Sequence, residues 1–199
     1  MLNFLSFETC SSNQSVSLFI DNKHVDLYQL ESKNSSQLPY VTKQILINNK
    51  VEIDDLNYIA VTIGPGSFTG IRVGLSLVQG LCFSSKLQIA PINILEVLSC
   101  NSEVEKGSLV GLYSHGDFIF CRYKNRKTIQ LLDVNTLKGK SIAGLGLDRF
   151  KEKIQITGLE CSSKDIGEYA IKNYRHVICE DIGRISPIYL NEYKVKINS

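Results

Sequence analysis

The sequence "GPGSFTGIRVGLSLVQG", from Gly64 to Gly80, decides how this chain is interpreted. Its first seven residues include three glycines, a proline, a serine and a threonine, and an apolar run follows. Glycine adopts backbone conformations that other residues avoid, and proline fixes φ and lacks a donor. The pattern predicts a tight turn followed by a helix over about 69–85, whose first turn Ser67 or Thr69 caps.

The turn serves either to bind an anion or only to direct the helix. Exposed N–H groups and the helix dipole favour an anion at a helix start. However, the Gly-Lys-Ser/Thr ending of a phosphate loop and the spacing of a dinucleotide fingerprint are both missing. Arg72 lies in the first turns, where a cation opposes the dipole. We therefore expect Arg72 to pair with Glu8 or Glu96, or to contact a bound anion.

The helix after the turn is apolar on nearly every face, so it needs cover on all sides. One side can pack on a sheet. Gly70 and Gly74 form a smooth strip that a second helix could approach, and the predicted helix around 41–47 could lie beside it. Two interpretations follow: both are ordinary core helices, or together they present an apolar face to another protein.

The order of predicted elements favours an α/β fold. Three antiparallel strands precede a helix, a buried strand and further helices, which is the layout of a ribonuclease-H-like or actin-like domain. A polar linker at 101–107 divides the chain into lobes at 1–102 and 103–199. The predicted strands cover 3–9, 15–20, 24–30, 58–63, a short segment before Pro91, three segments within 108–134, and 141–146. The predicted helices cover about 36–48, 69–85, 92–100 and 162–174, and 185–196 is extended or irregular. Ser35 or Ser36 is expected to cap the first of these helices, and a serine at its start to cap the last.

Composition excludes several classes of protein. The chain has 199 residues, 43% of them hydrophobic, and a net charge of +2, which is too small to indicate a nucleic-acid binder. Its six cysteines form no CxxC pair and have no histidine at metal spacing, so we expect reduced thiols rather than disulfides or zinc. We find no secretory signal and no apolar run of membrane-spanning length, and we expect a cytoplasmic protein.

Four segments resemble one family. "DDLNYIAVTIGPGSFTGIRVGLSLVQGLC", at 54–82, resembles the signature of the TsaB family, also called YeaZ. "FETCSSNQSVSL" resembles the first hairpin of the family, and "SLVGLYSHGDFIFCRY" resembles the strand pair of its second half. "ISPIYLNEYK" resembles its C-terminal Pro-x-Tyr-Leu element. The match is strong over 50–83 and looser elsewhere.

The resemblance implies an ASKHA fold, related to actin and Hsp70, with two small lobes that each have a mixed sheet and packed helices. It implies a non-catalytic partner subunit in the synthesis of N6-threonylcarbamoyladenosine on tRNA. In that family TsaD transfers threonylcarbamoyl, from threonylcarbamoyl-adenylate, to the adenosine beside the anticodon, and the ATPase TsaE joins the pair. ATP and metal are then expected on the partner subunits and none on this chain. The tRNA is contacted within the complex, and the chain alone could form a homodimer.

The resemblance also implies site residues, none of them catalytic or metal-binding. A contact with an anion or nucleotide at the subunit junction is implied for Glu8, Ser67, Thr69 and Arg72. The partner interface is implied for residues of the two N-terminal helices: Leu38, Val41, Ile45, Gly70, Val73, Gly74, Leu77, Val78 and Leu81.

The chain departs from the family pattern at several positions. Glu8 replaces a frequent aspartate, Lys33 and Asn34 replace a His-Ser pair, and Tyr113 to His115 replace Asp-Ala-Arg. These departures leave the contacts of those side chains open. The chain is short for the family, so we expect a trimmed second lobe.

Two enzyme classes remain as alternatives. A stand-alone actin-like ATPase or phosphotransferase would bind magnesium and ATP at the Glu8 hairpin. A peptidase is less favoured, because the sequence has no HExxH motif and no nucleophile–base pair. The basic segment 123–127, "YKNRK", could contact tRNA phosphate, although a solvated hairpin turn is typical of such a sequence.

Overall fold

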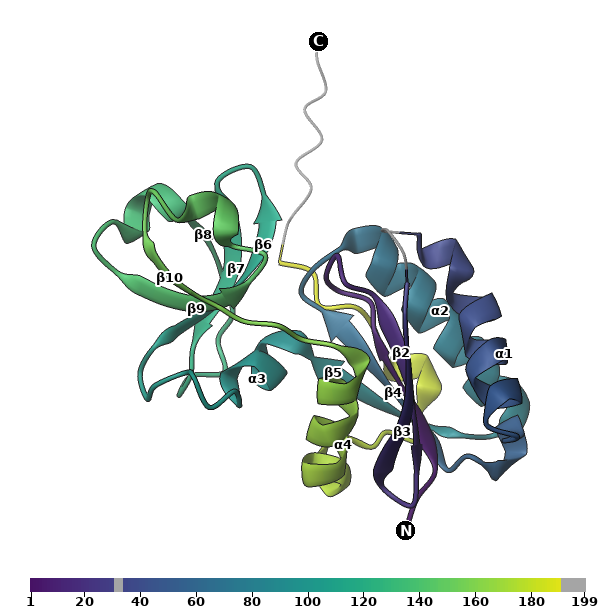
Figure 1. The fold of residues 1–199 in the computed structure, drawn as a ribbon. Coiled ribbons are helices and arrows are strands. Elements are labelled where there is room, and N and C mark those ends of the chain that lie inside the picture. Colours follow the sequence, from purple (N-terminus) through teal and green to yellow (C-terminus); the bar gives the residue numbers. More distant parts are fainter. Residues whose placement is uncertain (31–33, 191–199) are drawn as a thin grey trace.

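The described residues, 1–30 and 34–190 of a computed structural model, form two five-stranded sheets in two lobes (Figure 1). The first sheet has the order β3-β2-β1-β4-β5, in which β1, β2 and β3 are an antiparallel meander and β4 and β5 run parallel to β1. This confirms the predicted mixed α/β fold. The strands are β1 (Phe4–Glu8), β2 (Ser15–Ile20), β3 (Lys23–Gln29), β4 (Tyr58–Gly64) and β5 (Gln88–Asn93).

The central strands β1 and β4 are buried on both faces. Their apolar runs do not alternate with polar residues, as is typical of a strand covered by helices on either side. The strand β5 lies at the sheet edge and continues through Pro91, which an edge strand tolerates. The helix predicted from about Ile92 to Cys100 is confirmed, with a slightly later start. Helix α3 (Ile94–Ser99) begins later, where the Asn93 side chain accepts a hydrogen bond from Leu95 N at 3.0 Å.

Helices cover both faces of the first sheet (Figure 1). Helices α1 (Leu38–Asn48) and α2 (Phe68–Ser85) pack on one face, where Leu5 and Ile59 lie in the same apolar cluster as residues of both helices. Helix α4 (Ser163–Val177) packs on the other face, against Phe4 and Phe19. All three helices were predicted, with ends within a few residues.

The second lobe contains the sheet β10-β9-β6-β7-β8. Four of its strands were predicted, but β10 was not, because its four residues are mostly exposed and carry no apolar run. The strands are β6 (Leu109–His115), β7 (Phe118–Tyr123), β8 (Gln130–Asp133), β9 (Ser141–Leu145) and β10 (Gln155–Gly158). Short 3-10 turns lie at Ser35–Gln37, Ile53–Asp55, Val134–Leu137, Asp148–Phe150 and Ile182–Arg184.

Helix α4 belongs to the first lobe, although it follows the second sheet in the chain. Ser6 Oγ donates a hydrogen bond to Ser163 O at 2.7 Å, and Ser163 N donates to Ser15 Oγ at 2.8 Å. The hydroxyl groups of Ser17 and Ser163 are also 2.7 Å apart. The predicted division near residue 102 therefore describes where the two sheets separate, whereas the chain crosses back to the first lobe at α4.

Two of the three predicted serine caps form. Ser67 Oγ accepts from Gly70 N at 3.2 Å at the start of α2, and Ser162 caps α4. The cap predicted for α1 at Ser35 or Ser36 is wrong, because both lie in a 3-10 turn before the helix. Ser35 is buried and donates instead to Gln14 Oε1 at 2.9 Å. Among the described residues, no helix is both long and apolar enough for a membrane span.

Candidate functional site: an interlobe cleft and an exposed helix face

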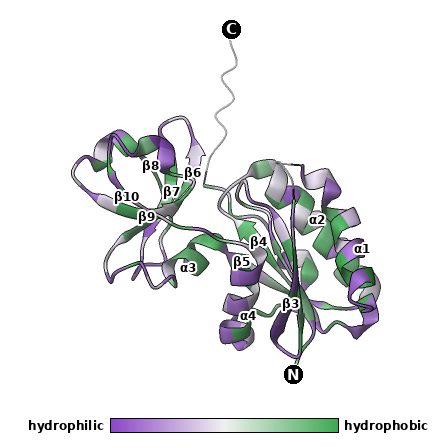
Figure 2. Cartoon of the chain, viewed as in Figure 1, coloured by the Kyte–Doolittle hydropathy of each residue, from purple (hydrophilic) through white to green (hydrophobic). Residues whose placement is uncertain are grey.

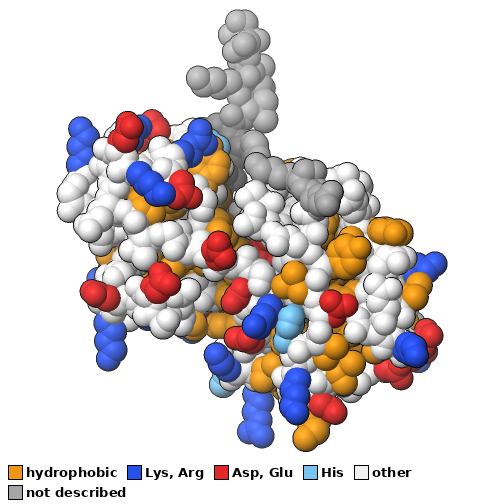
Figure 3. Space-filling model, in the orientation of Figure 1, with side chains coloured by type: hydrophobic (Ala, Val, Ile, Leu, Met, Phe, Trp, Pro, Cys, Tyr) orange, Lys and Arg blue, Asp and Glu red, His pale blue; other side chains and the backbone are white. Residues whose placement is uncertain are grey.

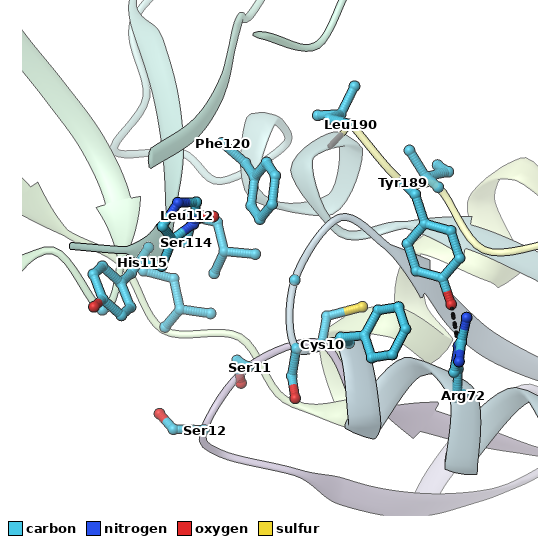
Figure 4. Close-up of a pocket in the computed structure, with 17 residues that line it drawn as sticks. Cys10, Ser11, Ser12, Arg72, Leu112, Ser114, His115, Phe120, Tyr189 and Leu190 are labelled. Carbon is cyan, nitrogen blue, oxygen red and sulfur yellow. Dashed lines mark hydrogen bonds between the residues drawn. The ribbon is translucent and has the colours of Figure 1, made fainter. Parts of the chain in front are cut away.

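A cavity of about 610 Å³ lies between the two lobes (Figure 4). The loop after β1 and the start of α2 line it from the first lobe, and β6 and β9 line it from the second. The C-terminal segment closes another side. Its lining includes Cys10, Ser11, Arg72, Ser114 and Tyr189. Residues on three of these segments carry sequence signals, but their convergence depends on the pairing of distant strands.

Glu8 lies beneath this cavity and does not line it. Its Oε1 accepts hydrogen bonds from Cys10 N at 2.7 Å and Ser11 N at 2.9 Å, and its Oε2 accepts from Ser11 Oγ at 2.8 Å. The side chain is fully buried, and this burial raises the pKa of Glu8 to about 7. The carboxyl group therefore holds the hairpin loop together, and it does not face a ligand.

The cavity does not fit the magnesium nucleotide that actin-like ATPases bind. Magnesium prefers carboxylate and water oxygens, and the described lining residues include hydroxyl groups, aromatic rings and Arg72 but no Asp or Glu. Where the family has Asp-Ala-Arg, Ser114 Oγ and His115 Nδ1 lie 2.9 Å apart. In the described part of the chain, no cluster of three His, Cys, Asp or Glu residues could hold a metal ion.

Arg72 has aromatic partners, so the prediction of an ion pair with Glu8 or Glu96 is wrong. Its Nε donates to the Tyr189 hydroxyl at 2.8 Å, and its guanidinium carbon lies 3.8 Å from the centroid of the Phe68 ring. The Phe68 and Tyr189 rings are 5.3 Å apart. Tyr189 could be found from the Pro-x-Tyr-Leu resemblance, but its contact with Arg72 has no sequence signal.

The glycine strip of α2 faces this chain and not a partner. A Cβ atom at Gly70 would collide with the Thr9 carbonyl oxygen, and one at Gly74 would lie 2.6 Å from Thr9 Cγ2. The two glycines therefore let α2 approach the first hairpin closely. The prediction that this strip receives a second helix is wrong.

Four more of the predicted interface residues lie in the core of the first lobe. Leu38, Val41, Ile45 and Val78 are buried against the sheet, so a second protein cannot reach them. Their predicted assignment to the partner interface is therefore wrong. Val73, Leu77 and Leu81 are only partly buried, and they remain candidates for contact with a partner.

Large apolar side chains that were not predicted lie on the exposed side of the same helices. Tyr40 is 63% exposed and Ile47 55% on α1, and Phe83 is 83% exposed on α2. With Val73, Leu77 and Leu81 they make up the α1–α2 face. Figure 2 shows green segments on both of these helices, with purple ones between them on α1, whereas α4 is mostly purple. The seven-residue spacing of Tyr40 and Ile47, opposite Val41 and Ile45, could have revealed them.

Fold and cleft together define a two-lobed α/β protein of the ASKHA class. The family model described as TsaD, tRNA N6-adenosine threonylcarbamoyltransferase, matches residues 29–165 of this chain. This match, together with the similarity to relatives named TsaB and YeaZ, shows that the chain belongs to the TsaB (YeaZ) family.

Three relatives illustrate the similarity. The TsaB protein of Buchnera aphidicola subsp. Baizongia pistaciae is 29% identical over 94% of this chain and 97% of its own length. The TsaB protein of Buchnera aphidicola subsp. Schizaphis graminum is 44% identical over 62 residues, which are 31% of this chain and 29% of that protein. The structure of YeaZ from Pseudomonas aeruginosa has a TM-score of 0.75 at 18% identity, and the match covers 96% of this chain and all of that one. This last likeness concerns the fold.

Proposed function

We propose that this chain is a partner subunit in the synthesis of threonylcarbamoyladenosine on tRNA, and that it binds TsaD through the α1–α2 face. The relatives named TsaB are described as tRNA threonylcarbamoyladenosine biosynthesis proteins, and the matching family model is that of the transferase. The exposed apolar side chains of the α1–α2 face are the observation that carries the proposal. TsaD would supply the transfer site, and this chain would support it.

The α1–α2 face has the character of a protein interface. Single exposed apolar residues are normal on a surface, whereas several large ones on two adjacent helices favour a binding site. Figure 3 shows orange side chains gathered where Figure 1 places α2 and α1. Burying one large apolar side chain contributes about 1.5–3 kcal/mol, so covering Tyr40, Ile47 and Phe83 would stabilise a complex considerably.

The proposal assigns ATP, metal and catalysis to the partner subunits TsaD and TsaE, and places the complex with its tRNA in the cytoplasm. The inward position of Glu8 and the carboxylate-free lining of the cleft support the assignment of catalysis. The alternative, a stand-alone ATPase, is tested by calorimetry of the isolated chain with ATP and magnesium. Saturable binding that is lost in Glu8→Ala would favour the ATPase.

Leu77→Glu tests the interface. Leu77 is partly exposed on α2, so a carboxylate there remains solvated in the free chain but is desolvated in the complex. We expect Leu77→Glu to lose co-purification with TsaD, and the modification of tRNA by TsaD and TsaE to fall with it. Val78→Glu is unsuitable, because Val78 is fully buried and the variant would unfold.

Val25→Glu is the matched control. Val25 is 46% exposed on β3, in the same lobe but away from the α1–α2 face, and it receives the same carboxylate. We expect it to pair with TsaD like the wild type. Circular dichroism melting of both variants checks that they fold. Wild-type pairing by a folded Leu77→Glu variant would refute the proposed interface.

A further inference from the structure

Arg72 is held in a defined orientation at the cleft end of the α1–α2 face. It follows the first turn of α2, next to Val73, and it also lines the interlobe cavity. The Tyr189 hydroxyl accepts a hydrogen bond from its Nε, as the dashed line in Figure 4 shows, and the Phe68 ring lies 3.8 Å below its guanidinium carbon. These two contacts fix both the position and the plane of the guanidinium group.

Neither contact uses the terminal nitrogens of Arg72. A guanidinium group has five N–H donors, and the bond to Tyr189 uses one of them. Within residues 1–30 and 34–190, none of the ion pairs includes Arg72. The pair of terminal nitrogens that binds a carboxylate bidentately is thus not engaged by an acidic side chain of the described chain.

The charged side chains of α1 and α2 are of one sign. Neither α1 nor α2 contains an Asp or Glu residue, whereas Lys43 is exposed on α1 and Arg72 on α2. A second copy of this chain docked on the same face would bring these cations together, and like charges at an interface disfavour pairing. A different protein that presents carboxylates complements the face.

We propose that Arg72 is the electrostatic anchor of the α1–α2 face and binds a carboxylate of a heterologous partner subunit. This rests on the proposed function, because it names the chemistry by which that partner is recognised. An oriented guanidinium loses little conformational freedom on binding, and arginine is enriched among the residues that dominate interface energies. Tyr189 is then a positioning residue, since it acts through Arg72.

The dissociation constant of the complex with TsaD tests this anchor in three variants. Arg72→Gln removes the charge, and we expect binding about 30-fold weaker or worse, as for loss of one partner of a buried charge pair. Arg72→Lys keeps the charge but loses the planar pair of donors, and we expect a loss of about tenfold. Tyr189→Phe removes only the orienting hydroxyl, and we expect a loss of about threefold.

Arg126→Gln is the matched control. Arg126 is also an exposed arginine beside an aromatic ring, 5.6 Å from the Tyr123 centroid, but it lies in the second lobe. We expect its affinity for TsaD to stay within about twofold of the wild type. Raising the salt concentration should weaken wild-type pairing more than that of Arg72→Gln, because screening acts on the charge pair.

Replacing each Asp or Glu on the surface of TsaD by its amide identifies the carboxylate. In double-mutant cycles, one of these substitutions should show no further loss when combined with Arg72→Gln. Wild-type affinity of Arg72→Gln, or the absence of any coupled acid, overturns the proposal. Calorimetry with inorganic phosphate tests a second alternative. If phosphate binds the wild type but not Arg72→Gln, and pairing with TsaD requires phosphate, the proposal is also overturned. Self-association lost on Arg72→Gln would identify a second copy as the occupant, and it would likewise overturn the proposal.

The outcomes separate this proposal from the one it rests on. If Leu77→Glu abolishes pairing and Arg72→Gln does not, the partner interface stands and the anchor is wrong. If both variants pair like the wild type, the α1–α2 face is not the interface, and if the wild type itself does not pair with TsaD, the proposed function fails. Melting curves of the Arg72 variants check that these exposed substitutions leave the fold intact.

Discussion

Glu8 shows at the scale of one residue how burial changes the role of a carboxyl group. The sequence places an acidic residue in the first hairpin, where the resemblance implies a contact with an anion or nucleotide. The structure turns its side chain inward, where it accepts three hydrogen bonds from Cys10 and Ser11. The sequence shows that position 8 is acidic, but the direction of the Glu8 side chain depends on packing around the loop.

Burial of Glu8 predicts a specific pH dependence of stability. Its folded pKa of about 7 lies above the ordinary value of 4.5, so the stability that it contributes is fully present below pH 4.5 and is lost as pH rises through 7. Ionising the buried carboxyl then lowers the free energy of unfolding by about 3 kcal/mol. We expect Glu8→Gln, which cannot ionise, to gain stability relative to the wild type by about that amount between pH 4.5 and pH 8.5.

Urea denaturation of both proteins at the two pH values measures this difference. The comparison of the two proteins cancels the titration of the other groups. A difference in unfolding free energy that stays constant with pH would mean that Glu8 ionises normally in the folded chain.

Helix α2 illustrates what can be inferred at the scale of one element. Its existence, its serine cap and its glycine turn follow from local pattern, and all three are present. Which side lies inside was not predicted, because apolar residues lie on nearly every side of the helix and only the short polar row of Arg72, Ser76 and Gln79 marks the solvent. In the structure Gly74 and Val78 face the core, while Leu77 and Gly80 lie toward the exposed side.

Two glycine substitutions in α2 should therefore have opposite effects. Gly74→Ala places a methyl group 2.6 Å from Thr9 Cγ2, and we expect a loss of about 1–3 kcal/mol in unfolding free energy. Gly80→Ala meets no atom within 4 Å, and we expect a gain of up to about 1 kcal/mol, because alanine favours helix. Urea denaturation measures both. A Gly74→Ala variant as stable as the wild type would contradict this orientation of α2.

At the scale of the whole molecule, a polar network joins the two lobes. Arg122 on β7 lies 3.3 Å from Glu96 on α3, and Tyr169 on α4 donates to the same carboxylate at 3.0 Å. Burial and hydrogen bonding to Glu96 both raise the pKa of Tyr169. Three elements far apart in the chain thus meet beside the crossing between lobes.

Loss of this network should be measurable. Arg122 is only 7% exposed, so Glu96→Gln leaves it without its counter-charge, and we expect about 2 kcal/mol less stability. Asp148→Asn is the control, because it breaks the solvent-exposed pair with Lys151 and should cost under about 1 kcal/mol. Thermal melting compares them, and equal effects would argue against a structural role for the buried pair.

The sequence by itself determined the order of the strands and helices apart from β10, the glycine turn and the family, because these depend on residues close together in the chain. Only the tertiary structure decided which side of α2 is exposed, where Glu8 points, that Arg72 meets Tyr189, and that α4 returns to the first sheet. Those features depend on which surfaces of distant segments pack together and exclude water. A local sequence pattern does not indicate which distant segments will meet.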